Sequence, residues 1–137
     1  MRFIILLLSV LPLNSYAEQY DFSSPEKTLL SYYKCAETKD EKCVLSHIEG
    51  IGSFQFNVAS KVIDYEIKKK IVFSDKEVSE WNSKGIIPSA KLGDIQIDVQ
   101  KITLYNGSTK EEGMYTYVLR KYDDKWKIYS WYGWGSP

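Results

Sequence analysis

Few residues of this chain could move a proton in an enzyme. Acid–base chemistry of the isomerase or dehydratase type needs a carboxylate or histidine with a raised pKa, and an opposing hydrogen-bond donor that holds an oxyanion. His47 is the single histidine, and it falls late in an expected helix, where a carbonyl or solvent commonly satisfies the imidazole. Asp64 and Asp98 alternate with apolar residues, so we expect their carboxylates on a solvated strand face. No residue is therefore assigned a catalytic role.

Other chemical signatures are missing from the sequence. It has no serine-hydrolase elbow, glycine-rich phosphate loop, zinc-binding helix or cysteine-nucleophile pattern. Two cysteines and one histidine do not form a metal ligand set by themselves, so neither a metal nor a cofactor is expected. Basic and acidic residues number 18 each, which gives no electrostatic reason to bind nucleic acid or anionic lipid.

Aromatic residues are the remaining chemical signal, with four tryptophans and eleven tyrosines. Tyrosine and tryptophan are enriched at protein interfaces, and their polar tips can also serve as donors in a pocket. Packing of a sheet core is the alternative, because aromatic residues favour strands in any case. The candidate binding residues are Tyr115, Tyr117, Tyr129, Trp131, Tyr132 and Trp134.

The last third of the chain, residues 94–135, must position these aromatic side chains. Apolar and polar residues alternate from Ile95 to Val99, which is typical of a strand with one buried face. The alternation then slips by one, because the next apolar residues are Ile102 and Leu104. Either the apolar residues change sheet faces, or an extra residue near Gln100-Lys101 forms a β-bulge. The bulge is the favoured interpretation.

Two turns divide this region into three antiparallel strands. A turn at residues 106–108 and a polar loop to Gly113 precede a strand over Met114–Tyr122. Asp123-Asp124 then turns the chain into the final strand, Trp126–Trp134. Aromatic residues occur at both parities of that strand, so both of its faces are expected to be covered or to line a pocket.

The first half of the chain is predicted to be helical. Ser24-Pro25-Glu26 supplies a capping hydroxyl, a proline and an acid, and the helix it opens should run to Thr38. A second helix is expected from its N-cap Asp40 to a stop at Gly50. Its inward residues are predicted to be Val44, Leu45 and Ile48.

The middle of the chain is harder to interpret. Residues 51–58 alternate like a strand, but neighbouring glycines argue for a loop. Residues 62–73 predict a long strand, although apolar residues that step by four keep a helix as the competitor. Ser74 and Glu77 form a capping box that opens a short helix ending by Gly85.

The N-terminus carries an export signal. Arg2 precedes the apolar run Phe3–Leu13, and cleavage is expected after Ala17. The alternative is a membrane anchor, but this run is shorter than the ~20 residues needed to span a bilayer. The mature chain, Glu18–Pro137, is long enough for one domain. We therefore expect a protein of the bacterial periplasm, or one that is secreted.

Export makes a disulfide between Cys35 and Cys43 the expectation. On one continuous helix the two residues would be about 12 Å apart, beyond the ~7 Å that a disulfide can bridge. The bond therefore requires a chain reversal at residues 38–40. Two buried free thiols are the alternative.

The expected order is helix, helix, strand, helix and three strands. With the helix start at Ser24–Leu30 and the hairpin end at Tyr122–Ile128, the chain resembles the nuclear transport factor 2-like superfamily, which includes ketosteroid isomerase and SnoaL-like enzymes. The resemblance covers most of Ser24–Trp134. It implies an α+β fold, a cone-like or cystatin-like roll in which N-terminal helices pack on a curved antiparallel sheet. The mouth of such a cone can hold a ligand, and some members are toxin-immunity proteins.

These observations favour an exported, non-enzymatic binding or accessory domain. Its concave sheet face is expected to engage a protein partner, of the immunity type for example, or a small apolar ligand. The alternative function is an acid–base enzyme that uses the cone pocket. A homodimer that buries the sheet face against itself is a third interpretation.

Overall fold

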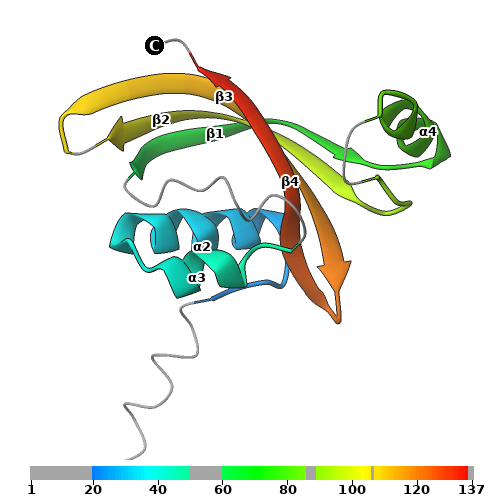
Figure 1. Ribbon diagram of the computed structural model, residues 1–137, viewed down its shortest axis with the longest axis horizontal. Helices are drawn as coiled ribbons and strands as arrows, with labels where there is room; N and C mark the ends of the chain where they lie inside the picture. The colour runs from blue at the N-terminus through cyan, green and yellow to red at the C-terminus, as the bar shows by residue number, and fades with distance from the viewer. Residues whose placement is uncertain (1–19, 50–59, 86–88, 106, 136–137) are drawn as a thin grey trace, which may run out of the picture.

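The computed structural model describes residues 20–49, 60–85, 89–105 and 107–135. Over these residues the fold is α+β, with two N-terminal helices against one face of a curved, four-stranded antiparallel sheet (Figure 1). The strands follow one another in the sheet in chain order. The predicted fold class is therefore confirmed. The elements are α2 (Pro25–Thr38), α3 (Glu41–Ser46), β1 (Ser60–Val72), α4 (Asp75–Ser83), β2 (Ile95–Tyr105), β3 (Thr109–Tyr122) and β4 (Lys125–Gly135).

Helix α2 begins and ends where the sequence predicts. The Ser24 hydroxyl accepts a hydrogen bond from the Lys27 N–H at 3.1 Å, and Pro25 occupies the first turn. The helix ends at Thr38, because Lys39 adopts a left-handed conformation with φ of 60°. That residue reverses the chain, as the cysteine spacing requires.

The disulfide between Cys35 and Cys43 is present, with the two Cα atoms 5.5 Å apart. It joins α2 to α3, whose N-cap Asp40 accepts a hydrogen bond from the Cys43 N–H at 3.2 Å. Helix α3 ends at Ser46, so it stops before the predicted Gly50, which lies outside the described residues. Leu45 is 42% exposed, so its predicted inward position is wrong.

Strand β1 confirms the strand interpretation of this segment, and the competing helix is wrong. The strand is not regular. Its register against β2 shifts between Val62 and Asp64 and again between Ile67 and Lys69. Each shift inserts an extra residue, so the apolar residues do not share one sheet face as their spacing suggests. The segment 51–58 lies outside the described residues.

The predicted bulge near Gln100-Lys101 is wrong. Strands β2 and β3 pair without interruption from Ile95 opposite Leu119 to Tyr105 opposite Thr109. The alternation slips because the apolar residues change faces while the register continues. Lys101 therefore follows Val99 on the face that is turned toward α2, as the alternating geometry of a strand requires.

The first hairpin turn is tighter than the polar loop predicted from the sequence, and the second lies at Asp123-Asp124, as predicted. Strand β3 already begins at Thr109, so the predicted loop up to Gly113 belongs to the strand. Gly107 takes a positive φ of 77° in the first turn. Asp123 and Asp124 have φ of 47° and 65°, the two left-handed residues of a type I′ hairpin turn.

Strand β4 is bulged, which redistributes its aromatic side chains. Leu119 pairs with Ile128, whereas Val118 pairs with Ser130, so Tyr129 is the extra residue. The outer edge of β4 is partly covered by the chain after α3. The Glu49 N–H donates to the Ile128 carbonyl at 2.9 Å, and the Ile128 N–H donates to the His47 carbonyl at 2.8 Å.

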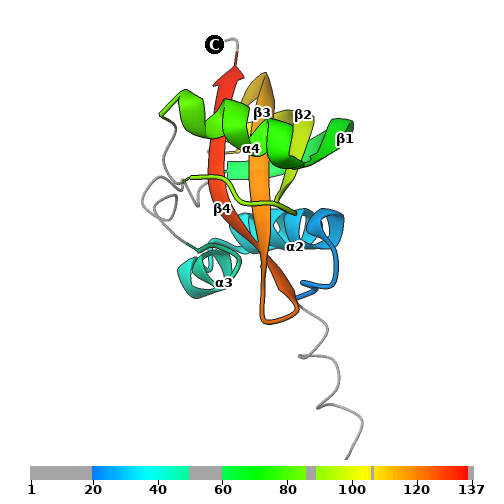
Figure 2. The ribbon, with the colours of Figure 1, turned by 90° about the vertical axis from the view of Figure 1, so that its right-hand side faces the viewer.

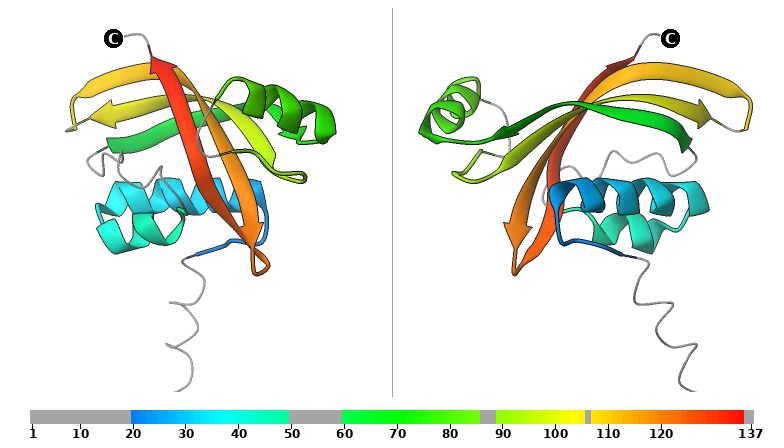
Figure 3. Two further views of the ribbon diagram at one scale, coloured as in Figure 1. Left: turned by 45° about the vertical axis from the view of Figure 1, so that its right-hand side comes forward. Right: turned by 180° about the vertical axis from the view of Figure 1, so that it is seen from behind.

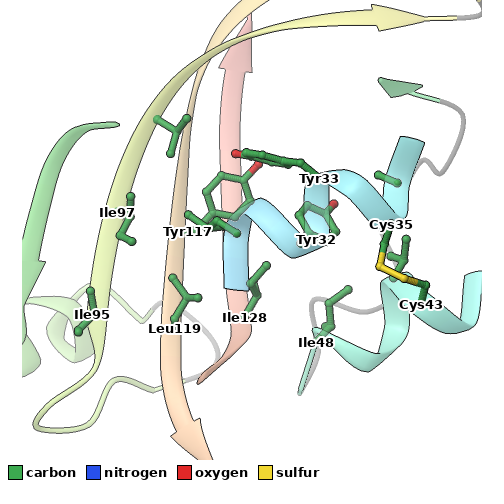
Figure 4. Close-up of a cluster of buried hydrophobic side chains, with 14 residues drawn as sticks. Tyr32, Tyr33, Cys35, Cys43, Ile48, Ile95, Ile97, Tyr117, Leu119 and Ile128 are labelled. Atoms are coloured by element: carbon green, nitrogen blue, oxygen red, sulfur yellow. A yellow bond between two sulfur atoms is a disulfide. The ribbon is translucent and has the colours of Figure 1, made fainter. Parts of the chain in front are cut away.

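Hydrophobic side chains are buried on both faces of the sheet. The larger cluster fills the space between the concave face and helices α2 and α3, where Figure 4 shows Tyr33 beside Tyr117. The smaller cluster holds α4 against the convex face, on the other side of the sheet from α2 (Figure 2). Figure 3 shows the sheet arching over α2 and α3. The smaller cluster comprises Phe73, Trp81, Ala90, Val118 and Tyr129.

Candidate functional site

Lys101 lies on the concave face of β2 with its ammonium group among tyrosines. Its Nζ donates a hydrogen bond to the Tyr117 hydroxyl at 2.9 Å. The same nitrogen lies 4.2 Å from the ring centroid of Tyr115, 5.1 Å from that of Tyr33 and 5.6 Å from that of Tyr117. Aromatic faces attract a cation electrostatically, so these rings partly replace the water that the ammonium loses.

Three elements bring this group together. Tyr33 projects from the buried face of α2, and Tyr115 and Tyr117 occupy alternate positions of β3. Tyr115 pairs with Gly133 of β4. A Cβ at Gly133 would overlap the Cδ1 and Cε1 atoms of the Tyr115 ring, so the missing side chain creates the space in which that ring lies.

The Lys101 ammonium has no carboxylate partner among the described residues. Glu111 shares the concave face by register, since it pairs with Thr103, but it makes no ion pair with Lys101. Burial lowers the pKa of Lys101 to about 8, because desolvation disfavours the charged form. Burial also raises the pKa of Tyr117, so its phenol stays neutral at physiological pH.

Two further polar atoms on this face lack a hydrogen-bond partner of standard geometry within the described residues. They are the Thr103 Oγ1 and the Tyr33 hydroxyl, and both are buried. The Tyr33 and Tyr117 hydroxyls lie side by side (Figure 4), and Tyr117 opposes part of the rise that burial causes in the pKa of Tyr33. A buried polar atom without a partner is costly, so these two atoms add unused hydrogen-bonding capacity to this face. We call Lys101, Thr103, Tyr33, Tyr115 and Tyr117 the lysine–tyrosine site.

The structure brings three of the six predicted binding residues together. Tyr115 and Tyr117 belong to the lysine–tyrosine site, and Trp131 pairs with Tyr117 and packs against the same core. The backbones of Tyr132 and Trp134 pair with β3, but their side chains lie outside what the structure describes.

Tyr129 lies on the opposite, convex face. Its hydroxyl donates to Asp94 at 2.7 Å, and Arg120 donates to both carboxylate oxygens of Asp94, at 2.8 and 2.7 Å. The Asp94 side chain is 2% exposed, and the Lys91 N–H also donates to it at 2.8 Å. Because Arg120, Tyr129 and the Lys91 N–H all donate to the buried Asp94 carboxylate, this cluster fixes the loop before β2.

His47 is a structural residue. Its Nδ1 donates to the Cys43 carbonyl at 2.7 Å, which leaves Nε2 to accept from the Ser31 hydroxyl, also at 2.7 Å. Burial lowers the pKa of His47, so the imidazole stays neutral at pH 7. Ser31 and His47 are only 5% and 0% exposed, so this pair cannot present a nucleophile to a substrate.

The strand carboxylates are also accounted for. Asp98 accepts a hydrogen bond from Thr116 at 2.7 Å, and Asp64 is exposed. Asp64 and Glu112 line an open groove of about 190 Å³ on the convex face. No group of three acidic, histidine or cysteine side chains in the described part of the chain is arranged to hold a metal ion.

Lys101 was missed by sequence reasoning, although a signal was present. The slip in alternation after Val99 places a lysine where an inward apolar residue is expected. A bulge explains that slip as a change of register and keeps the lysine in solvent. The unbroken register of β2 shows that the lysine itself is turned inward.

Comparisons with known proteins add no identification. Neither a protein-family model, nor a curated protein, nor a solved structure matches this chain. Among the described residues, no helix combines the length and the apolar character needed for a membrane crossing.

Proposed function

We propose that the protein is an exported binding domain whose concave sheet face takes a small aromatic ligand carrying an anionic oxygen. The observation that carries this proposal is the Lys101 ammonium, which is held among tyrosine rings with no carboxylate partner in the described structure. A largely desolvated charge without a counterion is unfavourable, and a ligand anion would relieve that cost.

The rest of the site has the chemistry that such a ligand needs. The partly exposed Tyr115 ring offers a face for an aromatic body, and the Thr103 hydroxyl offers a further hydrogen-bonding group. A purely apolar ligand, as expected from the aromatic content alone, would leave Lys101 without a counterion and the Thr103 hydroxyl without a hydrogen-bond partner. The geometry therefore adds an anionic group to the small apolar ligand that the sequence predicts.

The acid–base alternative has less support. It needs a buried carboxylate or histidine that faces the pocket, but Asp94 is paired with Arg120 on the convex face and His47 is bonded within the helical layer. These groups have no access to the lysine–tyrosine site. A binding role is favoured for that reason.

Export and superfamily membership belong to the same proposal. The disulfide between Cys35 and Cys43 is compatible with an oxidising compartment such as the periplasm. The curved sheet over two N-terminal helices is compatible with the nuclear transport factor 2-like resemblance. A fold alone does not define a function, so the ligand proposal depends on the site.

A matched pair of small ligands tests the proposal. Benzoate and benzyl alcohol share an aromatic ring, but only benzoate carries a negative charge. In protein-observed NMR titrations at pH 7, we expect benzoate to shift the amide signals of β2 and β3 and to bind about tenfold more tightly than benzyl alcohol, the value of one charge-assisted hydrogen bond.

Two control variants distinguish charge-dependent binding at Lys101 from nonspecific binding. Lys101→Met should remove the preference for benzoate, whereas Lys69→Met should retain it, because Lys69 is an exposed lysine of the same sheet. Equal binding of both ligands by the native protein would contradict the anionic site. Absence of binding by either ligand would contradict a small-ligand site and favour a protein partner.

A further inference from the structure

We propose that Lys101 captures carbonyl compounds: its ε-amine condenses with the carbonyl carbon of an aromatic aldehyde held among Tyr33, Tyr115 and Tyr117, and forms an imine. This inference rests on the proposed function, because it assigns a class of covalent ligand to the same lysine–tyrosine site. It goes beyond reversible binding, since the site would then also perform a chemical step.

The position of Lys101 meets the first requirement of such a reaction, a lysine with a free amine. Several other lysines of the described structure form ion pairs with carboxylates, which favour the ammonium form. Lys61 contacts Glu37 at 3.0 Å, and Lys68 contacts Glu66 at 2.9 Å. Lys101 has no such partner, and desolvation lowers its pKa to about 8, so a substantial fraction of its amine is neutral near pH 8.

The second requirement is a group that moves protons during the reaction. The amine lone pair attacks the carbonyl carbon, the C–N bond forms, and the nitrogen loses a proton to the new alkoxide, which gives a neutral carbinolamine. The hydroxyl then leaves as water with the second nitrogen proton, and a C=N bond remains. The Tyr117 hydroxyl lies 2.9 Å from Nζ, so it can give a proton to the leaving hydroxyl and receive one from the nitrogen.

The balance of this step is complete without a cofactor. One amine and one carbonyl compound give one imine and one water molecule, and nothing is oxidised or reduced. The partly exposed Tyr115 ring, 4.2 Å from the Lys101 Nζ, supplies a surface on which an aromatic aldehyde can lie while its carbonyl faces Lys101.

Reductive trapping tests the inference. The native protein is incubated with benzaldehyde and cyanoborohydride at pH 7.5, then digested, and each lysine is quantified by mass spectrometry. A trapped lysine gains the mass of the probe less one oxygen atom. We expect Lys101 to be modified at least tenfold faster than the exposed strand lysines Lys69 and Lys110, which serve as internal controls, and benzoate to slow the modification of Lys101 alone.

The outcomes distinguish this inference from the binding proposal. If benzoate binds in the NMR titration but Lys101 is trapped no faster than Lys69, carbonyl capture is wrong and the binding site stands. If Lys101 is trapped rapidly without protection by benzoate, the reaction does not use the proposed site, which contradicts the inference. If benzoate does not bind and Lys101 is unreactive, both proposals fail.

Discussion

At the scale of single residues, the desolvated ammonium of Lys101 determines how stability and binding depend on pH. Its pKa is lowered to about 8 in the folded protein, against an ordinary value near 10.4 in the unfolded chain. Between about pH 8 and 10.4, Lys101 is more fully protonated in the unfolded chain than in the folded protein. The contribution of Lys101 to the free energy of unfolding therefore rises with pH in this range. Below pH 8 the folded protein carries a buried charge at a constant cost.

Lys101→Met removes that dependence. In urea unfolding at pH 7, we expect the variant to have a higher free energy of unfolding than the native protein. By pH 10 that difference should shrink by about 2 kcal/mol, after allowance for the partial solvent contact of Lys101. The groups that face Lys101 are Tyr33, Tyr65, Tyr115 and Tyr117, with Glu111 on the same face. They are present in both proteins, so their own titration largely cancels. A difference that does not change with pH would contradict the lowered pKa.

Gly133 supports the site through Tyr115. In Gly133→Ala the new Cβ would overlap the Tyr115 ring, which must move away from Lys101. We expect a loss of about 1–3 kcal/mol in the free energy of unfolding and weaker binding of benzoate. Adding Tyr115→Ala removes the overlap, so the double variant should lose less stability than the sum of its two single changes. Strict additivity in this double-mutant cycle would contradict the contact.

At the scale of elements, short sequence patterns predicted helix caps and turns well, but they predicted the register between strands poorly. The caps at Ser24, Asp40 and Ser74 and the turn at Asp123-Asp124 involve residues near in sequence, so short patterns predict them. Bulges depend on how distant strands pair. The shifts in β1 and β4 leave no comparable local pattern, and the one predicted bulge, in β2, is absent.

The disulfide between α2 and α3 allows a stability test at this scale. Replacing both Cys35 and Cys43 by alanine should lower the free energy of unfolding by about 2.5 kcal/mol, since the reduced chain gains the entropy of a small open loop. Dithiothreitol should lower the stability of the native protein similarly and leave the double variant unchanged. A native protein that keeps its urea midpoint after complete reduction would contradict this role.

The ion pair of Asp94 and Arg120 fixes the chain between α4 and β2. Arg120→Met would leave the Asp94 carboxylate buried without its main partner, at an expected cost of about 3 kcal/mol in the free energy of unfolding. Lys121→Met is the matched control, because Lys121 is an exposed neighbour whose contact with Asp124 spans 3.9 Å. Similar effects for both variants, measured by urea unfolding, would show that the pair contributes little.

At the scale of the whole molecule, the sequence predicted the architecture better than the site. The helix and strand order follows from hydrophobic periodicity, and the aromatic pattern named Tyr115, Tyr117 and Trp131 among the candidate binding residues that the structure brings together. The sequence pattern did not distinguish Tyr129 from the other candidate binding residues, because a bulge in β4 turns Tyr129 toward α4 on the convex face. It also missed Lys101, because an inward lysine is rarer than a slip in register.

Export is tested on the whole chain. Expression with bacterial secretion and purification without reductant should yield a protein that begins at Glu18 and carries the bond between Cys35 and Cys43. Intact mass spectrometry before and after reduction measures both features, since reduction adds two hydrogens. A mass that retains residues 1–17, with free thiols, would contradict the exported assignment.

The most direct test of the central claim is the titration of Lys101 itself. Lysine labelled with carbon-13 gives one εCH₂ signal for each lysine in an NMR spectrum, and Lys101→Met identifies the signal of Lys101 by its loss. The account predicts a midpoint near the pKa of about 8. It also predicts that benzoate raises this midpoint, because an anion stabilises the charged form. A midpoint near 10.4, as in an exposed lysine, would show that Lys101 is solvated and would contradict the proposed site.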